Sequence, residues 1–580
     1  ARAAGVGVGV VKGLLEKGYI GFVEVEPAPE TPATRPLEAF PLGARMGASP
    51  EGDRPLGEQP KVCPEGDRPL GEQGPEALCP EGDRPAGEQP KVCPEGDRPL
   101  PQVPVRLQGG RLLERLRVLA GLIQEGPALV LFPEVSLLKK CQPFFPDATV
   151  LHGEMKAEER RRVWAQAGLG KWVLATYQGL LLPRSWERIV VMEEAAPAYK
   201  LPGGSRASLP RLARLRAQGL GVPIHYCSSV NSAEVWEEPA YSLPPPRLRL
   251  HLLDLRRERG WPLTGAALAL LRQVQEKNRQ AIVLSARRGY SAVLRCKRCD
   301  WKAMCPNCAL PLRYHKGGRL GLLQCHQCGH EEKAPELCPS CQSDVFDPRG
   351  PGVEWLLEAL ELYLPTLPRY RYTAEAKDPL SPLLAGEPGV LVGTNAVLRA
   401  PVLPELALVL LPYADGFLLE ADFRAAERYH RLLWQLADLH PQRHPLLVLQ
   451  TFEPAHTAHQ ALQAASPRAF MEAELALRRT LGYPPASRMV KLEVTHAKEP
   501  VARDAIYQLA QALKAHAQPG ELLGPAPAPV ARLRGRYVFH LLLKSSEARI
   551  QALMAQLPPV RAARLKIDPD PQVFVGLLED

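Results

Sequence analysis

The chain has 580 residues, of which 45% are hydrophobic and 23% are charged. At roughly 150 residues per domain, this length leaves room for about four globular domains. Lys and Arg outnumber Asp and Glu by 72 to 63, and the resulting net charge of +9 weakly favours an anionic partner such as nucleic acid. No apolar run reaches the ~18 residues of a membrane span, so we expect no membrane partner. The chain begins at Ala1 rather than Met, so we expect a processed or incomplete N-terminus.

Residues 1–26 combine a helical pattern with a strand pattern. Val10, Leu14 and Leu15 have helical spacing, and residues 20–25 alternate as in a strand. A short helix followed by a β-ribbon predicts a partial winged-helix-like segment, a kind of module that docks on DNA or protein. Any small α/β edge would explain the same pattern.

Residues 27–105 have the composition of a disordered linker. Pro, Gly, Glu and Asp dominate, and the phrase PEGDRP recurs from Pro50, Pro64, Pro80 and Pro94. This repeat is too short and too polar to stack an apolar face, so burial cannot offset the entropy lost on ordering. Lone cysteines that we do not expect to bind metal fall within it: Cys63, Cys79 and Cys93.

Strand and helix patterns alternate between residues 106 and 240. Leucines at helical spacing from Leu112 to Leu122 mark an amphipathic helix, and residues 158–168 mark another. Short apolar runs predict strands at 128–132, 172–177, 188–192 and 223–227. This alternation predicts a first α/β lobe, with a parallel sheet covered by helices on both faces.

A second α/β pattern brackets a cysteine-rich segment at 296–341, with residues 241–295 before it and 342–480 after it. The predicted strands are 281–286, 389–394, 406–411 and 445–450, and the predicted helices are 353–362 and 423–439. The cysteine-rich segment is therefore an insertion in a second lobe. Residues 481–580 predict a separate C-terminal α+β domain, with strands at 488–496, 537–544 and 564–568.

The insertion holds four Cys-x-x-Cys pairs, which read CKRC, CPNC, CHQC and CPSC. Two such pairs complete a tetrahedral zinc site, so eight thiols predict two zinc ions. Disulfides are the alternative, but no secretory signal precedes the pairs, and a redox site would need only one pair. Reduced, metal-binding cysteines favour the cytoplasm.

The spacing leaves the pairing of these cysteines open. A consecutive scheme would place Cys296, Cys299, Cys305 and Cys308 on one ion, although only five residues separate the two pairs. We favour a nested scheme, because it lets the insertion leave and rejoin its host lobe at one point. That scheme assigns Cys296, Cys299, Cys338 and Cys341 to the first ion and Cys305, Cys308, Cys325 and Cys328 to the second. We expect His326 and His330 to lie beside the ligands or on the surface.

Two tandem α/β lobes are typical of a nucleotide-driven motor. Such a motor needs a Gly-rich loop that ends in Gly-Lys-Ser/Thr and opens a helix. The nearest string is GLGK at 168–171, but Trp172 follows it and the string precedes a strand. We interpret this similarity as chance.

Several stretches of the chain resemble the primosomal replication-restart helicase family, PriA. They are SARRGYSAVLRCKRCDWKAMCPNCALPL (285–312), LQCHQCGHEEKAPELCPSC (323–341), ADFRAAERYHRLL (421–433), LRRTLGYPPASRM (477–489) and LGPAPAPVARLRGRYVFHLLLK (523–544). The resemblance implies two RecA-like, helicase-type lobes, a zinc insertion with nested pairing in the second, and a C-terminal domain. It also implies a role in replication restart, in which the protein binds stalled or abandoned forks and promotes primosome assembly and reloading of the replicative helicase. The implied partners are forked DNA, primosome and helicase-loading proteins, and a single-stranded-DNA-binding protein.

The chain departs from this family where the motor motifs should lie. The segment 107–126 resembles the phosphate loop in outline but lacks its Lys-Thr pair, and the magnesium-binding Asp-Glu-Glu-His reads Met192 to Ala195. The arginine-finger motif is replaced in 435–445. Because phosphoryl transfer needs phosphate cradle, metal and arginine together, we predict no catalytic and no nucleotide-binding residues. We predict that Glu193 and Glu194 are relics at the end of a strand. The family's N-terminal domain is not visible before Ala1.

These observations predict a fork-binding scaffold without helicase activity. Candidate DNA contacts combine arginines for phosphates with aromatic rings for unpaired bases. They are Arg287, Arg288, Tyr290, Arg298 and Trp301, with Arg295, Lys297 and Lys302 beside them, and a second patch of Arg532, Arg534 and Arg536. A solvated basic rim would explain the same residues.

Two alternatives remain open. A divergent DNA-dependent ATPase or 3′–5′ helicase would need a lysine near Gly109–Arg111, where only Arg111 is available. A purely structural zinc scaffold would bridge proteins without contacting DNA.

Overall fold

The computed structural model describes most of the chain between residues 105 and 572. Within that range it leaves out 124–125, 167–169, 202–204, 287–293, 297, 300, 302, 307–311, 316–320, 325–329, 345, 349–351 and 419–421. The predicted winged-helix-like segment and all but the last residue of the predicted linker lie outside the described residues. In the described part of the chain, no helix combines the length and apolarity needed to cross a membrane.

The first lobe is built on a seven-stranded parallel sheet with strand order β3-β4-β2-β5-β6-β1-β7. Its strands are β1 (Val105–Gly109), β2 (Ala128–Leu131), β3 (Thr149–Leu151), β4 (Trp172–Ala175), β5 (Arg188–Met192), β6 (Ile224–Cys227) and β7 (Ala240–Leu243). Its helices are α2 (Leu112–Leu122), α3 (Val135–Cys141), α4 (Ala157–Gln166) and α5 (Leu209–Leu220). The predicted strands correspond to β2, β4, β5 and β6, and both predicted helices are confirmed.

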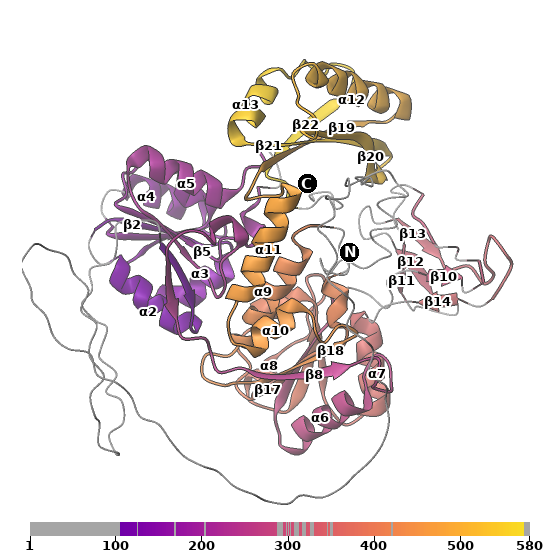
Figure 1. Ribbon diagram of the computed structural model, residues 1–580. Helices are drawn as coiled ribbons and strands as arrows, with labels where there is room; N and C mark the ends of the chain where they lie inside the picture. The colour runs from indigo at the N-terminus through magenta and orange to yellow at the C-terminus, as the bar shows by residue number, and fades with distance from the viewer. Residues whose placement is uncertain are drawn as a thin grey trace, which may run out of the picture. The chain divides into compact units, whose positions relative to one another are not determined.

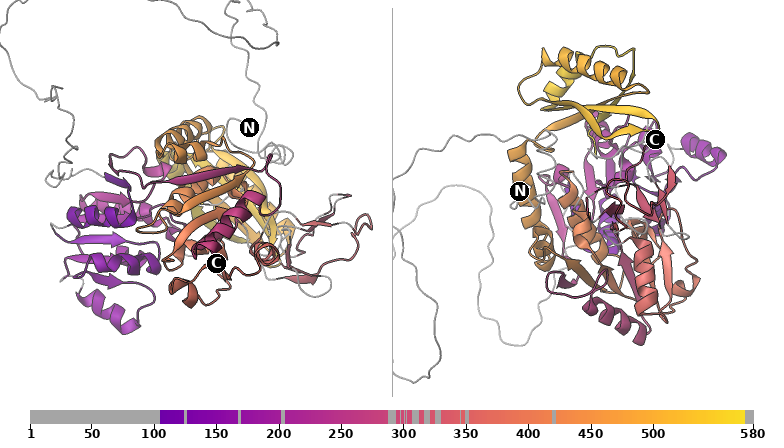
Figure 2. Two further views of the ribbon diagram at one scale, coloured as in Figure 1. Left: turned by 90° about the horizontal axis from the view of Figure 1, so that it is seen from below. Right: turned by 90° about the vertical axis from the view of Figure 1, so that its right-hand side faces the viewer.

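Both faces of this sheet are buried, as predicted. Leu129 and Leu131 of β2 point to the face that α5 covers, where Ala213 is buried. Val130 points to the opposite face, where it packs with Leu116 of α2. Helices therefore lie on both sides of the strands (Figure 1 and Figure 2).

The second lobe has a six-stranded parallel sheet with strand order β15-β16-β9-β17-β18-β8. Its strands are β8 (Arg249–Asp254), β9 (Gln280–Leu284), β15 (Arg369–Tyr372), β16 (Gly389–Gly393), β17 (Leu406–Leu411) and β18 (Leu446–Thr451). Its helices are α6 (Gly265–Glu276), α7 (Val353–Tyr363), α8 (Ser381–Leu384), α9 (Ala425–Ala437), α10 (Thr457–Gln463) and α11 (Arg468–Leu481). Two buried clusters again occupy the two faces, one with α6 and α7 and the other with α9, α10 and α11.

The cysteine-rich insertion lies between β9 and α7, as predicted. Its strands are β10 (Leu294–Cys296), β11 (Arg313–His315), β12 (Leu322–Gln324), β13 (Glu331–Lys333) and β14 (Phe346–Pro348). The first strand, β10, pairs antiparallel with the last, β14. The chain therefore enters and leaves the insertion side by side, which is the arrangement that a nested pairing of cysteines needs.

The C-terminal residues form an antiparallel sheet with strand order β20-β21-β19-β22. Its strands are β19 (Arg488–His496), β20 (Leu522–Leu533), β21 (Arg536–Ser545) and β22 (Arg564–Pro569), and its helices are α12 (Glu499–Lys514) and α13 (Glu547–Ala555). Ile506 and Leu509 of α12 pack against Leu492 and Leu541 of the sheet. The three strands predicted here are confirmed.

A buried ion pair ties the C-terminal sheet to the first lobe. The Nζ atom of Lys200 lies 2.7 Å from Asp568 of β22, and both side chains are 1% exposed. Lys200 also donates to the backbone carbonyls of Pro569 and Asp570. Lys491 is the second cation near this carboxylate, at 3.8 Å.

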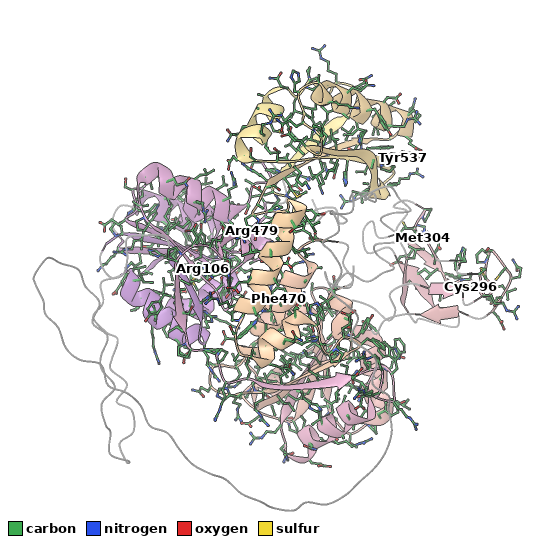
Figure 3. The ribbon with its side chains drawn as sticks, in the orientation of Figure 1. Arg106, Cys296, Met304, Phe470, Arg479 and Tyr537 are labelled. Atoms are coloured by element: carbon green, nitrogen blue, oxygen red, sulfur yellow. The ribbon has the colours of Figure 1, made fainter. Side chains whose placement is uncertain are left out.

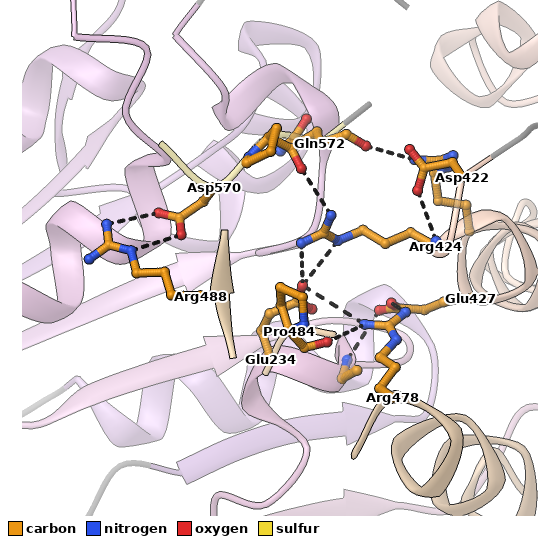
Figure 4. A network of polar contacts seen from close by, with 12 residues as sticks. Glu234, Asp422, Arg424, Glu427, Arg478, Pro484, Arg488, Asp570 and Gln572 are labelled. Carbon is orange, nitrogen blue, oxygen red and sulfur yellow. Dashed lines mark hydrogen bonds and ion pairs between the residues drawn. The ribbon is translucent and has the colours of Figure 1, made fainter. Parts of the chain in front are cut away.

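Arginines of the second lobe make a further junction, which Figure 4 shows. Arg424 donates to Glu234 of the first lobe at 3.0 Å and to the carbonyl of Pro571. Arg478 is 2% exposed and lies 2.5 Å from Glu427. Arg424 thus joins the second lobe to the first through an ion pair and to the C-terminal residues through a backbone carbonyl.

We predict that Lys200→Met weakens the attachment of the C-terminal domain, because it leaves the buried Asp568 carboxylate without its closest cation. Loss of one partner from a buried pair costs about 3 kcal/mol. Hydrogen exchange of the β22 amides measures the effect. Lys139→Met is the matched control, since its pair with Glu154 is exposed on both sides and such pairs are worth at most about 1 kcal/mol. Equal protection of β22 in both variants would contradict the prediction.

Candidate metal centre and lobe interface

The structure brings together the four thiols that the nested scheme assigns to one ion. The sulfur atoms of Cys296 and Cys341 lie 3.5 Å apart, as do those of Cys299 and Cys338, and all four ligand atoms fall within 4.8 Å of one another. Zn–S bonds of about 2.3 Å in a tetrahedron place sulfurs about 3.8 Å apart. The cluster, in which Cys296 is labelled in Figure 3, therefore fits a zinc ion.

Backbone hydrogen bonds in a tight turn favour the thiolate form of Cys296. The backbone N–H of Arg298 donates to the sulfur of Cys296 at 3.4 Å. Burial opposes ionisation, but N–H donors from Cys299 and Arg298 lower the pKa of Cys296 to about 6. On the other side of the site, Gln342 donates to the carbonyl of Cys338 and has a left-handed φ of 56°. Zinc requires the thiolate form, which this hydrogen bonding favours.

The second predicted ligand set is described only at Cys305. This residue is buried in the small apolar core of the insertion, with Leu294, Leu312 and Leu323. Its three partners, Cys308, Cys325 and Cys328, lie outside the described residues, as does His326. His330 lies near the surface, with Nε2 at 3.1 Å from Glu332. The second zinc site stays a prediction.

The structure brings the two candidate DNA-binding patches close together. Trp301 and Leu533 pack against the same apolar core of the insertion. Leu533 stands at the end of β20 between Arg532 and Arg534, and the Arg532 guanidinium lies 5.3 Å from the Tyr537 ring centroid. Exposed side chains of the two patches are Arg298, Arg534 and Arg536. The described residues do not include Arg287, Arg288, Tyr290, Lys297 and Lys302, nor the side chain of Arg295.

The loop between β1 and α2 resembles a phosphate-binding turn in outline, but its donors are already used. The N–H of Gly109 donates to Ser229, that of Gly110 to Pro244, and that of Arg111 to Glu114 at 2.6 Å. A Cβ atom at Gly109, whose φ is +75°, would lie 2.3 Å from the carbonyl oxygen of Leu243. Strand β7 therefore packs against the loop backbone at the point where a phosphate group would need free N–H groups.

A carboxylate from the second lobe occupies the N-terminus of α2. The backbone N–H of Leu112 donates to Asp438, which follows α9, and an Arg115 nitrogen donates to the same carboxylate at 3.0 Å. Arg115 is 2% exposed and also donates to the carbonyls of Gly109 and Gly110 at 2.9 Å. Burial raises the pKa of Asp438, and Arg115 opposes that shift. Asp438 thus sits where helix N-termini commonly bind anions.

Glu193 takes part in this interface, whereas Glu194 is bound within the first lobe. That both are relics of a metal site stays a prediction. Glu193 lies 3.9 Å from Arg115 and 3.7 Å from Arg431 of the second lobe. Glu194 is buried and accepts hydrogen bonds from the backbone of Ser232 at 2.6 Å and from the side chains of Ser228 and Asn231. Two successive carboxylates directly after the apolar run of β5 are the sequence feature that could have pointed to such pairing.

Arg111 adds a second set of contacts across the lobes. Its guanidinium donates to the carbonyls of His440 and Arg443 at 3.1 Å and lies beside the ring of His444. These acceptors belong to 435–445, the segment that replaces the arginine-finger motif. The three divergent motor segments therefore meet at one interface, where sequence reasoning missed Arg115, Arg431 and Asp438.

Two family descriptions match separate parts of the chain. Residues 479–572 match "Primosomal protein N C-terminal domain", and residues 305–333 match "PriA DNA helicase Cys-rich region (CRR) domain". These two segments match PriA-family domains, and the chain is similar to PriA proteins. Its two parallel sheets, with the cysteine-rich insertion in the second, are the RecA-like lobes that the resemblance implied.

Relatives in the PriA family match long stretches of the chain. The probable replication restart protein PriA of Deinococcus radiodurans is 39% identical over 80% of this chain and 54% of its own length. The replication restart protein PriA of Treponema pallidum is 29% identical over 74% of this chain and 69% of its own length. The chain thus spans about half to two thirds of the length of these relatives. A crystal structure of the DUF1998 helicase MrfA bound to DNA aligns with a TM-score of 0.34 and 14% identity, over 64% of this chain and 46% of that chain.

We predict that Cys338→Ser lowers the zinc content of the purified protein by one ion per chain, because a thiolate is lost from the tetrahedral set. Metal analysis by mass spectrometry measures this directly. Cys63→Ser, which removes a cysteine predicted not to bind metal, should leave the content unchanged. Equal zinc content in the wild-type protein and in Cys338→Ser would refute the assignment.

We predict that Asp438→Ala accelerates hydrogen exchange at the Leu112 amide by at least about fivefold. The substitution removes its acceptor and leaves the buried Arg115 unpaired, a loss of about 1–3 kcal/mol. Arg479→Ala is the control, since Arg479 pairs with Glu237 across the same lobes but both side chains are exposed. If both variants exchange alike at Leu112, Asp438 does not cap α2.

Proposed function

We propose that this chain is a fork-binding scaffold of replication restart whose lobes close on each other without nucleotide. The observation that carries this proposal is the Asp438 carboxylate at the N-terminus of α2, paired with Arg115. A nucleotide phosphate would have to displace this carboxylate. Breaking a buried pair costs about 3–5 kcal/mol, which would weaken nucleotide binding by at least about a hundredfold.

Basic residues around the insertion support DNA as a partner. Arg298 on the metal-binding turn and Arg534 and Arg536 on the β20–β21 hairpin are exposed. Their guanidinium groups can pair with phosphates, and Trp301 lies beside them to contact an unpaired base. We further assign Arg287, Arg288, Tyr290 and Arg532 to this surface from their sequence positions.

Relatives named replication restart proteins support the biological role. By this kinship, the chain binds stalled or abandoned forks, promotes primosome assembly and assists reloading of the replicative helicase. Its protein partners would be primosome and helicase-loading proteins and a single-stranded-DNA-binding protein. We also propose two zinc ions per chain in the nested arrangement, and the cytoplasm as the compartment because the thiols must stay reduced.

The divergent ATPase is less well supported. Arg111 is the cation that could replace the missing lysine, but its guanidinium contacts backbone carbonyls of the second lobe. Met192 stands where the family places a magnesium ligand, and a thioether is a poor ligand for that ion. A structural zinc scaffold that contacts no DNA would leave the exposed arginines without a role.

The experiment is to measure ATP turnover and fork binding on one zinc-loaded preparation. We expect forked DNA to bind with an affinity that falls steeply between 50 and 200 mM salt, because phosphate contacts release counterions. We expect no ATP turnover above background, with or without saturating fork. Fork-stimulated turnover would support the ATPase, and a flat salt response would support the structural scaffold.

A further inference from the structure

The segment that joins the two lobes is short and stiff. It runs from Pro244 to Leu248, between the end of β7 and the start of β8, and its first three residues are prolines. Each proline fixes its own φ at about −65° and has no N–H group to donate. Few backbone rotations therefore remain between the two ends of this connection, so that a contact at either end constrains the other.

Both ends of the connection are held by hydrogen bonds. The N–H of Gly110, in the loop before α2, donates to the carbonyl of Pro244 at 3.0 Å. At the other end, Nδ1 of His444 lies 3.0 Å from the carbonyl oxygen of Arg247. Gly110 belongs to the first lobe, and His444 lies just before β18 of the second lobe. Each lobe therefore holds one end of the connection.

His444 also meets the first lobe directly. A guanidinium nitrogen of Arg111 lies 2.7 Å from Nδ1 and 3.1 Å from Nε2 of the same ring. A neutral imidazole carries one N–H group and one free lone pair, and the partners of the ring decide which nitrogen carries the proton. With the proton on Nδ1, the ring donates to the Arg247 carbonyl and accepts from Arg111 through Nε2. The neutral ring thus satisfies both contacts.

A second proton on this ring would break the contact with Arg111. An imidazolium ion has an N–H group at both nitrogens and no lone pair, so Arg111 would lose its acceptor and face another cation. Histidine is the side chain whose charge ordinarily changes between about pH 5 and pH 8. The contact between the lobes at His444 therefore favours the neutral ring, and acid opposes it.

The groups around His444 would not compensate for the added charge. Burial, Arg443 and Arg111 together lower the pKa of His440, whose Nδ1 accepts the backbone N–H of Arg443 at 2.8 Å. Arg247 of the connection is exposed and adds a further cation. The carboxylates of this region already have partners: Glu405 pairs with Arg443 at 2.5 Å and with Arg279, Glu114 accepts from the backbone of Arg111 at 2.6 Å, and Asp438 pairs with Arg115 at 3.0 Å.

We propose that His444 is an acid-sensitive clasp that helps to hold the closed lobes together and releases Arg111 when its ring is protonated. The inference rests on the proposed function, in which the lobes close without nucleotide, and adds a condition that regulates this closure. The neutral ring is the form that the closed arrangement binds. Closure is therefore favoured at higher pH and weakened as the pH falls through the range in which histidine takes up a proton.

The test measures protection of the Leu112 amide against hydrogen exchange at about pH 7.5 and about pH 5.5, each corrected for the intrinsic exchange rate. This amide donates to Asp438 of the second lobe, so its protection reports contact between the lobes. In the wild-type protein we expect at least about fivefold lower protection at the lower pH, which corresponds to the loss of one hydrogen bond.

Two substitutions at His444 separate its charge from its hydrogen bonds. His444→Gln keeps a donor and an acceptor but takes up no proton, so its protection should differ by less than about twofold between the two pH values. His444→Lys is charged at both pH values and should give low protection at both. His496→Gln is the matched control, because it removes a titratable ring at the end of β19 in the C-terminal domain. It should respond to acid as the wild-type protein does.

Three results would overturn the inference. Wild-type protection could be equal at the two pH values. The acid response could persist undiminished in His444→Gln, which would assign it to Asp438, Glu193 or His440. His444→Lys could be as well protected as the wild-type protein at the higher pH. Thermal unfolding checks that each variant is folded. If Leu112 is unprotected in the wild-type protein even at the higher pH, the lobes are not closed and the proposed function itself fails, so the two failures are distinguishable.

Discussion

The ion pair between Arg115 and Asp438 is the interaction on which the arrangement of the two lobes depends. Both groups are almost out of reach of water, so neither can separate from the other without leaving a buried charge unpaired. Glu193 and Arg431 extend the pair into a chain of alternating charge from one lobe to the other. In a nucleotide-driven motor, the ligand supplies the charge that closes such a cleft. In this protein, side chains of the two lobes supply both the positive and the negative charges of the interface.

This substitution gives a physical reason for the pattern of motif loss. Once the Asp438 carboxylate occupies the N-terminus of α2, a lysine in the preceding loop would compete with Arg115 for that carboxylate. A magnesium ligand would also have no function, because no nucleotide phosphate could bind there. The zinc centre and the C-terminal sheet depend on separate contacts, Cys338 with its three partner thiols and Lys200 with Asp568. Under the proposed function, these contacts would persist unchanged in a chain without motor chemistry. The folded scaffold and the ATPase are separable in this architecture because they use different residues.

Much of the fold could be predicted from local sequence, and the interface could not. Strands β5 and β17 are continuous apolar runs buried on both faces, whereas β8 alternates with exposed residues and gives a weaker pattern. The Cys-x-x-Cys pairs could be found from their spacing, whereas the structure shows which two pairs meet, because β10 pairs with β14. Arg115 and Asp438 are 323 residues apart, and no periodicity relates them, so only the packed structure shows that they meet. For the same reason the contact of Glu193 with Arg431 could not be predicted.

The most direct test of this account is the distance between the lobes in solution. Dyes introduced through unnatural amino acids at the exposed positions Arg161 and Lys277 would report this distance by single-molecule energy transfer. The account predicts one narrow distance distribution in the absence of nucleotide, unchanged by a saturating ATP analogue. A broad distribution that narrows or shifts when the analogue is added would contradict it, because the lobes would then be closed by nucleotide rather than by the charges of the chain.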